Sequence, residues 1–293
     1  MTPLIMALLG ALVVLFVWYS SLWIVSERRR MPPAARVRPT LQELAVGFVT
    51  NFFDTLGIGS FAPSTAWFRL SRIVPDELIP GTLNVGHGLP TVVEALIFIV
   101  VIKIDPWLLV ALIAAATLGA WSGSAVVVRL DRRHIQLGMG SALLIAAVLF
   151  MLANLHLIPG GSDALALYGW KFGLAVGLNF IFGALMTVGV GQYGPCMIAL
   201  ALLGMNPSVA FPAMMGSCAF LQPAASVRFL RTRKYSLPAA LGLTLGGIPA
   251  VIIAAFIVKS MPLVAMRWLV VGVVLYVAIT MLRAALARPA STT

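Results

Sequence analysis

Two stretches of the sequence decide the fold, TLGIGSFAP at residues 55–63 and TVGVGQYGP at residues 187–195. Glycine allows non-helical backbone dihedrals and proline cannot donate an amide hydrogen bond, so each stretch is expected to interrupt a helix. Each lies within an apolar segment, residues 41–68 and 168–204, that is too long for one membrane crossing at about 1.5 Å per residue. We call the two stretches the first break and the second break.

The two breaks are related by an offset of 132 residues, which superposes the threonine, both glycines and the proline of one on those of the other. The same ungapped offset matches Pro75 with Pro207 and Pro80 with Pro212. Such a repeat indicates an internal duplication. The sequence therefore predicts five parts: an N-terminal transmembrane helix with a basic cytoplasmic loop (1–40), repeat 1 (41–157), an external linker (158–167), repeat 2 (168–286) and a tail (287–293).

The composition is that of a membrane protein. Of the 293 residues, 61% are hydrophobic and only 10% are charged, and the mean hydropathy is +1.02. A soluble domain carries about 25% charged residues, because its surface must be solvated. Apolar runs of about 20 residues can cross a hydrocarbon core of about 30 Å as helices. We expect an all-α polytopic membrane protein. A soluble enzyme, a disordered chain, a collagen and a disulfide scaffold are excluded, the last because the chain has only Cys196 and Cys218.

The basic residues predict how the chain is threaded. The net charge is +11, and in a membrane protein lysine and arginine collect in cytoplasmic loops, so we expect no nucleic-acid partner. If each break is the tip of a helical hairpin, four basic residues face outward, namely Lys103, Lys171, Lys259 and Arg267. If each broken segment crosses once, seven face outward. We prefer the hairpin topology, with the N-terminus outside and the C-terminus cytoplasmic in a bacterial inner membrane.

Each repeat then contains a hairpin plus three crossings, which is an odd number, so the two repeats are inverted relative to each other. Inverted repeats with interrupted helices are typical of secondary transporters. Charge counting leaves open whether the hairpins are re-entrant or cross the membrane fully. We favour re-entrant hairpins.

The breaks offer chemistry for an anion. The helix that follows a break points its N-terminus, with unpaired amides and about half a positive charge, at the gap. We expect these helices to start after Ser60 and Gln192, with a proline in each first turn. The alternatives are that glycine and proline only permit tight helix crossings and that Cys196 only packs. The candidate substrate-binding residues are Thr55, Gly57, Gly59, Ser60, Pro63, Ser64, Gly189, Gly191, Gln192, Tyr193, Pro195 and Cys196.

A stripe of polar residues marks one face of the segment 78–101. Asn84, His87, Thr91 and Glu94 follow an i, i+3, i+7, i+10 spacing, which lines one helix face. Ionisable residues inside a membrane segment are expensive and mark functional sites, and apolar surroundings favour the neutral form of an acid. We predict proton or cation coupling by this stripe together with Asn51 and Asp54; the alternative is a structural polar network. The equivalent segment of repeat 2 has no acid and no histidine.

Other site signatures are missing from the sequence. The glycines of the breaks lack the strand and the acidic residue of a dinucleotide site, and there is no Walker lysine, no histidine pair with metal spacing and no nucleophile elbow. We therefore expect no cofactor, no metal and no catalytic residue. The expected partners are the lipid bilayer and a small anion.

The chain resembles the sulfite exporter family named after TauE and SafE. The resemblance rests on FFDTLGIGS at residues 52–60 and VGVGQYGP at residues 188–195, and it extends over nearly the whole chain from about residue 41. It implies outward transport of small sulfur-containing anions, such as sulfite, thiosulfate or organosulfonates, in bacteria. Two other classes stay open: a passive anion channel, and a membrane-embedded enzyme that uses Asp54, His87 and Glu94 as acid–base groups.

Overall fold

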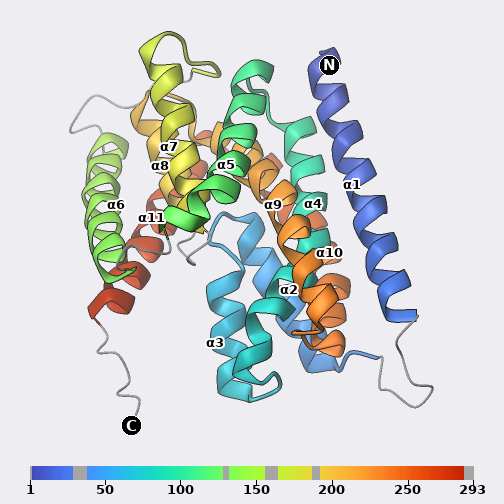
Figure 1. The fold of residues 1–293 in the computed structure, drawn as a ribbon. Coiled ribbons are helices and arrows are strands. Elements are labelled where there is room, and N and C mark those ends of the chain that lie inside the picture. Colours follow the sequence, from blue (N-terminus) through green and yellow to red (C-terminus); the bar gives the residue numbers. More distant parts are fainter. Residues whose placement is uncertain (1, 29–37, 128–131, 156–163, 187–191, 287–293) are drawn as a thin grey trace. The chain divides into compact units, whose positions relative to one another are not determined.

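The computed structural model describes residues 2–28, 38–127, 132–155, 164–186 and 192–286, and helices dominate this part of the chain (Figure 1). No β-strand occurs within these ranges. The expected all-α membrane fold is therefore confirmed. The α-helices and the two 3₁₀ turns (η) are α1 (Pro3–Arg28), α2 (Leu41–Thr55), α3 (Phe61–Ser71), η1 (Asp76–Leu78), α4 (Ile79–Val101), α5 (Pro106–Val127), α6 (Arg132–Asn154), α7 (Trp170–Met186), α8 (Tyr193–Leu202), η2 (Pro207–Val209), α9 (Ala210–Thr232), α10 (Leu237–Ser260) and α11 (Leu263–Leu286).

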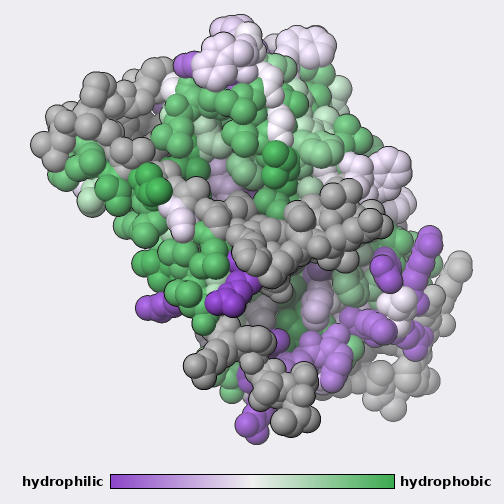
Figure 2. Space-filling model, turned by 60° about the vertical axis from the view of Figure 1, so that its left-hand side comes forward, coloured by the Kyte–Doolittle hydropathy of each residue, from purple (hydrophilic) through white to green (hydrophobic). Residues whose placement is uncertain are grey.

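Several helices suit a hydrocarbon environment. Three helical runs, Pro3–Arg28, Asp76–Val101 and Leu237–Ser260, are long and apolar enough to cross a membrane, and further apolar stretches lie in α5, α7, α8 and α11. Large hydrophobic side chains are exposed, including Trp121 (82%) and Phe256 (72%). Figure 2 shows one face on which hydrophobic side chains cover broad areas. Patches of this kind are unfavourable in water and favourable against lipid.

The first break has the predicted form. α2 ends at Thr55 and α3 begins at Phe61, and in Figure 1 the chain turns back between them so that the two helices form a hairpin. Gly57 and Gly59 have φ values of 93° and 90°, which side-chain-bearing residues rarely adopt. The amides of Gly57 and Ile58 close the end of α2 by donating to the carbonyl oxygens of Asp54 and Phe53.

The second helix pair stops and restarts at equivalent positions. α7 ends at Met186 and α8 begins at Tyr193, while Gly189 and Gly191 lie outside the described residues. The start of α8 follows that of α3 by 132 residues. α9, α10 and α11 each begin 131 residues after α4, α5 and α6. The helix starts thus recur after 131 or 132 residues, close to the offset of 132, and the division into two inverted repeats stays a prediction.

The described chain forms two compact units. The first contains residues 1–102 and 215–260, and the second contains residues 103–214 and 261–293. In the first unit α10 packs against α2 and α4, and in the second α7 packs against α5 and α6 against α11. Each unit therefore combines one broken helix pair with helices from the other predicted repeat.

Glycines let these helices approach closely. A Cβ atom on Gly47 of α2 would lie 2.3 Å from the carbonyl oxygen of Gly242 on α10. In the second unit, a Cβ on Gly183 of α7 would lie 2.0 Å from the carbonyl oxygen of Ala116 on α5. Small residues at such crossings are the usual means of packing helices in membranes, where lipid tails compete with apolar side chains.

The helix α1 is fastened to the first unit by polar contacts that the sequence does not reveal. The hydroxyl of Tyr19 donates to the carbonyl oxygen of Val85 on α4 at 3.1 Å. The indole Nε1 of Trp23 donates to the hydroxyl of Tyr235 at 3.2 Å, and that hydroxyl donates to Glu27. Partners for tyrosine and tryptophan polar atoms are expected when the rings are buried.

Candidate functional site

The candidate site in the first unit is built where the first break meets α4. Thr55, Ser60 and Ser64 of the break are all buried, with at most 3% of each residue exposed. Ser60 immediately precedes α3 and its side chain makes no capping hydrogen bond to the helix. Pro63 lies in the first turn of α3, as predicted. The N-terminus of α3 thus has unpaired backbone donors beside two buried hydroxyl groups.

Asp54 lies at the same place, 2% exposed. The hydroxyl and the backbone amide of Ser60 lie against its carboxyl group. The second carboxyl oxygen, Oδ2, has no hydrogen-bond partner within the described residues. A buried polar atom without a partner is costly and calls for an explanation, such as a bound group that completes it.

His87 joins three helices through its two ring nitrogens. Its Nε2 lies 3.0 Å from Ser64 Oγ on α3, and its Nδ1 lies 2.9 Å from Asn51 Oδ1 on α2. The amide Nδ2 of Asn51 donates to the carbonyl oxygens of Gly47, at 2.7 Å, and Leu243, at 3.3 Å. Asn51 Oδ1 must therefore accept from Nδ1–H of His87. In the neutral imidazole Nε2 is then the acceptor, and the hydroxyl of Ser64 donates to it.

Two further contacts extend the cluster along α4. The Thr55 hydroxyl lies 2.8 Å from Glu94 Oε1, and the Thr91 hydroxyl lies 3.0 Å from Gln222 Oε1 on α9. His87, Thr91 and Glu94 are fully buried. Asn84, the fourth residue of the predicted stripe, is not brought into the cluster, because its amide donates to Pro80 of its own helix. The structure thus joins three residues of the stripe to side chains of the helices around them.

A proline and a threonine hold α4 in place beside this cluster. Pro90 lies inside α4 and cannot donate to the carbonyl oxygen of Gly86. The hydroxyl of Thr244 on α10 donates to that oxygen at 2.7 Å. Thr244 is not predictable as a site residue, because nothing in the sequence around residue 244 points to a carbonyl on another helix.

The second unit places a separate set of polar residues at the start of α8. Gln192 Nε2 lies 3.4 Å from Asn179 Oδ1, and Asn179 Nδ2 donates to the carbonyl oxygen of Leu112 at 2.8 Å. Gln192 Oε1 has no partner in the described part of the chain. Tyr193, Pro195 and Cys196 are buried in the first turn of α8. Asn179 is not among the predicted site residues, although a single asparagine inside an apolar helix is a signal of a functional position.

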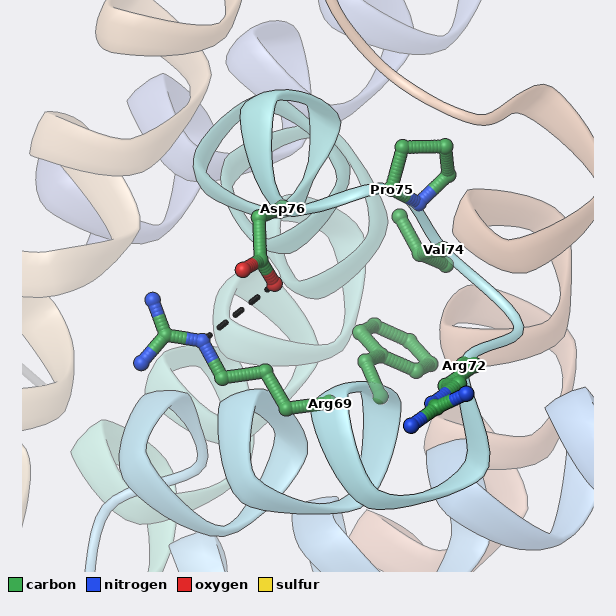
Figure 3. Close-up of a pocket in the computed structure, with 6 residues that line it drawn as sticks. Arg69, Arg72, Val74, Pro75 and Asp76 are labelled. Atoms are coloured by element: carbon green, nitrogen blue, oxygen red, sulfur yellow. Dashed lines mark ion pairs between the residues drawn. The ribbon is translucent and has the colours of Figure 1, made fainter. Parts of the chain in front are cut away.

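A surface cavity of about 360 Å³ lies at the other end of α3 (Figure 3). Its lining residues are Phe68, Arg69, Arg72, Val74, Pro75 and Asp76. Arg69 Nε lies 3.4 Å from Asp76 Oδ1, and both side chains are more than half exposed. The 11 residues of α3 separate this cavity from the break by about 16 Å. It is therefore no part of the candidate site.

Arg72 ends α3 in a strained conformation, and we expect Arg72→Gly to stabilise the protein. Its φ is 51°, and the equivalent end of α8 is occupied by Gly204 with φ 97°. A non-glycine residue in this region of backbone conformation destabilises the protein by about 1 kcal/mol. Replacing Arg72 by glycine removes this cost, so the melting temperature should rise by a few degrees. Arg69→Gly, three residues earlier and inside the helix, should lower it. A lower melting temperature for Arg72→Gly would contradict the expectation.

The electrostatics of the site are set by backbone amides, by neutral donors and by the carboxyl group of Asp54. No lysine or arginine of the described chain forms an ion pair with Asp54, His87 or Ser64. Positive potential therefore comes from backbone amides and neutral donors. No group of three or more His, Cys, Asp or Glu among the described residues could hold a metal ion.

Comparison with known proteins supports this description. The family model described as "Sulfite exporter TauE/SafE" matches residues 1–150, which cover α1 to α5, most of α6 and the first break. Neither a search of curated proteins nor a search of solved structures returned a match. The match covers just over half of the 293 residues and includes His87 and its partners on α2 and α3. On this match, the chain belongs to the sulfite exporter TauE/SafE family and is a membrane transporter of sulfur compounds.

Proposed function

We propose that this chain is a secondary transporter that exports small sulfur-containing anions, such as sulfite or organosulfonates, across the bacterial inner membrane. The observation that carries the proposal is the N-terminus of α3. There the Ser60 side chain makes no capping hydrogen bond to the helix and lies against Asp54, and the hydroxyl of Ser64 is buried close by. Sulfite and sulfonate groups are compact oxyanions that accept several hydrogen bonds. Helix N-termini with nearby hydroxyl donors bind such groups without needing a lysine or arginine.

The second break supplies a separate set of proposed binding residues, in the second unit. Gln192 has an unpartnered amide oxygen in the described chain and lies at the N-terminus of α8, where Tyr193 and Cys196 are buried. Its amide can rotate to present either donor or acceptor to a substrate. The residues that we propose to contact or shape a bound anion, each set within its own unit, are Thr55, Gly57, Gly59, Ser60, Pro63, Ser64, Gly189, Gly191, Gln192, Tyr193, Pro195 and Cys196.

Helix lengths support re-entrant hairpins. α2 has 15 residues and α3 has 11, so they measure about 22 and 16 Å along their axes. A hydrocarbon core is about 30 Å thick, so neither helix crosses it alone. We propose that both hairpins enter and leave on one side, that the two repeats are inverted, and that the C-terminus is cytoplasmic.

Coupling to a proton or cation is proposed for the first unit only. Asp54, His87 and Glu94 are buried there beside the break. Asn51 hydrogen-bonds to the ring of His87, and the hydroxyl of Thr91 donates to the backbone carbonyl oxygen of His87. A passive channel or a membrane-embedded enzyme could use the same groups. A channel would only dissipate an anion gradient and could not build one up from an imposed pH gradient, and an enzyme would form product without sealed vesicles.

The expected result in proteoliposomes is saturable, protein-dependent flux of sulfite or an alkanesulfonate. Purified full-length protein would be reconstituted with labelled anion on one side, and flux would be compared with protein-free vesicles. Ser60→Ala should reduce the affinity about tenfold, the loss expected for one hydrogen bond to a charged group. Ser122→Ala is the matched control, because its hydroxyl donates only to Leu118 of its own exposed helix face. Background flux for every sulfur oxyanion tested would refute the proposed substrate class.

A further inference from the structure

We propose that His87 is the proton-binding group of this transporter and that it acts through Ser64, so that one proton and one anion bind together. This inference rests on the proposed function and names which of three candidate groups performs the coupling. It follows from the direction of the hydrogen bonds in the chain Ser64–His87–Asn51.

Asn51 fixes the imidazole in one tautomer. Its Nδ2 is committed to the carbonyl oxygens of Gly47 and Leu243, so its Oδ1 accepts from His87 Nδ1. Without substrate, the hydrogen of the Ser64 hydroxyl therefore points at His87 Nε2. That hydroxyl is not available to donate to an anion at the N-terminus of α3.

Protonation reverses the bond between His87 and Ser64. A proton added to Nε2 makes this nitrogen a donor, so Ser64 Oγ becomes the acceptor. The hydroxyl hydrogen of Ser64 is then free to turn toward an anion at the start of α3. Nδ1 keeps its hydrogen and its bond to Asn51, so the imidazole ring need not move. The proton comes from hydronium in the surrounding solvent: its O–H bond breaks as the Nε2–H bond forms, and a water molecule is left.

The imidazolium needs the anion as its counter-charge. In the described part of the chain no carboxylate forms an ion pair with His87. From α3 it is faced by Ser64 and by the ring of Phe61, 5.7 Å away between centroids. Other buried ionisable groups lie on the helices packed against α4, namely Glu43 and Asp54 on α2 and Tyr19 on α1, and Glu94 lies on α4 itself. None of these four groups hydrogen-bonds to His87. A buried charge without a partner is strongly unfavourable, so proton and anion stabilise each other.

Asp54 and Glu94 are less suited than His87 to bind the coupled proton, because of the charge that each group has after protonation. A carboxyl group that takes up a proton becomes neutral and cannot balance a bound anion. An imidazole that takes up a proton becomes a cation and can. The bound complex is then electrically neutral, so transport follows the sum of the anion gradient and the pH gradient, and net export requires the anion to accumulate inside.

The test is binding of methanesulfonate to the purified protein by calorimetry, in buffers of different ionisation enthalpy, from about pH 5.5 to pH 8.5. The charge of this probe is constant over the range, unlike that of sulfite. The wild type should take up one proton per anion, and its affinity should fall about tenfold for each unit of rising pH. His87→Gln, which can donate or accept but cannot carry a proton, should bind without proton uptake and without pH dependence.

Two further pairs of variants make the result specific. Ser64→Ala should lose the linked proton uptake, whereas Ser64→Thr, which keeps the hydroxyl, should retain it; this pair decides the matter if His87→Gln does not fold. Asp54→Asn and Glu94→Gln should keep both the proton uptake and the pH dependence. Thr117→Val should also keep both; Thr117 lies in the second unit, and its hydroxyl donates to Ile113 of its own helix. Wild-type binding without proton uptake would overturn the inference and leave the proposed function standing. Persistent uptake in His87→Gln, or its loss in Asp54→Asn alone, would also overturn it. Failure of every sulfur oxyanion to bind would overturn both.

Discussion

Gly47→Ala is expected to reduce the free energy of unfolding by about 3 kcal/mol, because the new methyl group cannot be accommodated. It would lie 2.3 Å from the carbonyl oxygen of Gly242 and 2.7 Å from Leu243 Cα, and both are backbone atoms that cannot rotate away. α2 and α10 would have to separate along their contact. The measurement is the melting temperature in detergent, which should fall by more than about 5 °C.

Gly177→Ala is the matched control for this prediction. Gly177 also lies inside a membrane helix, α7, but a Cβ atom there meets nothing within 4 Å. Alanine has the higher helix propensity, so this variant should be unchanged or stabilised by up to about 1 kcal/mol. Equal melting temperatures for the two variants would contradict the prediction, because they would show that α2 and α10 can separate at Gly47 without loss of stability.

The loss in Gly47→Ala should extend to the candidate site. Asn51, one turn along α2, donates to Leu243 on the same face of α10 and positions His87. A displaced α2 would move Asn51 away from both partners. Anion binding should therefore weaken in Gly47→Ala and not in Gly177→Ala.

The sequence predicts the first break and the start of both downstream helices, because these depend on local chemistry. Glycine and proline act on the backbone within a few residues, so Gly57, Gly59 and Pro63 indicate where α3 begins. The polar face of α4 is also predictable, since helical spacing alone puts His87, Thr91 and Glu94 on one side. Asn84 has the same spacing but lies near the start of α4, partly exposed, where its amide bonds to its own helix.

The partners across helices could not be predicted in the same way. Asn51 meets His87, 36 residues later, and Thr55 meets Glu94, 39 residues later, only because α2 and α4 converge at the break. Asn179 illustrates a different obstacle: the offset of 132 residues pairs it with Gly47, so comparing the repeats conceals its bond to Gln192. Thr244 on α10 donates to the carbonyl oxygen of Gly86 on α4, which has no intrahelical donor because of Pro90. This hydrogen bond depends on how α4 packs against α10, and the sequence does not show that packing.

Asn51→Asp is expected to abolish the pH dependence of methanesulfonate binding and to slow transport at least tenfold, which corresponds to about 1.4 kcal/mol in the barrier. The substitution keeps the shape of the side chain and places a carboxylate 2.9 Å from His87 Nδ1. The imidazolium would then have a permanent counter-charge, and the anion would no longer be needed to hold the proton. A proton that does not leave with the substrate prevents the carrier from resetting.

The same substitution removes the donor that serves Gly47 and Leu243, so it should also destabilise the protein by about 1–3 kcal/mol. Asn206→Asp separates the two effects. The Oδ1 atom of Asn206 accepts from the amide and the hydroxyl of Ser208, and a carboxylate does this equally well. Asn206→Asp should therefore keep the wild-type melting temperature, pH dependence and transport rate. If Asn51→Asp still binds the anion with about a tenfold loss of affinity per pH unit, the proton is not held at His87, because a carboxylate beside that ring must change its protonation.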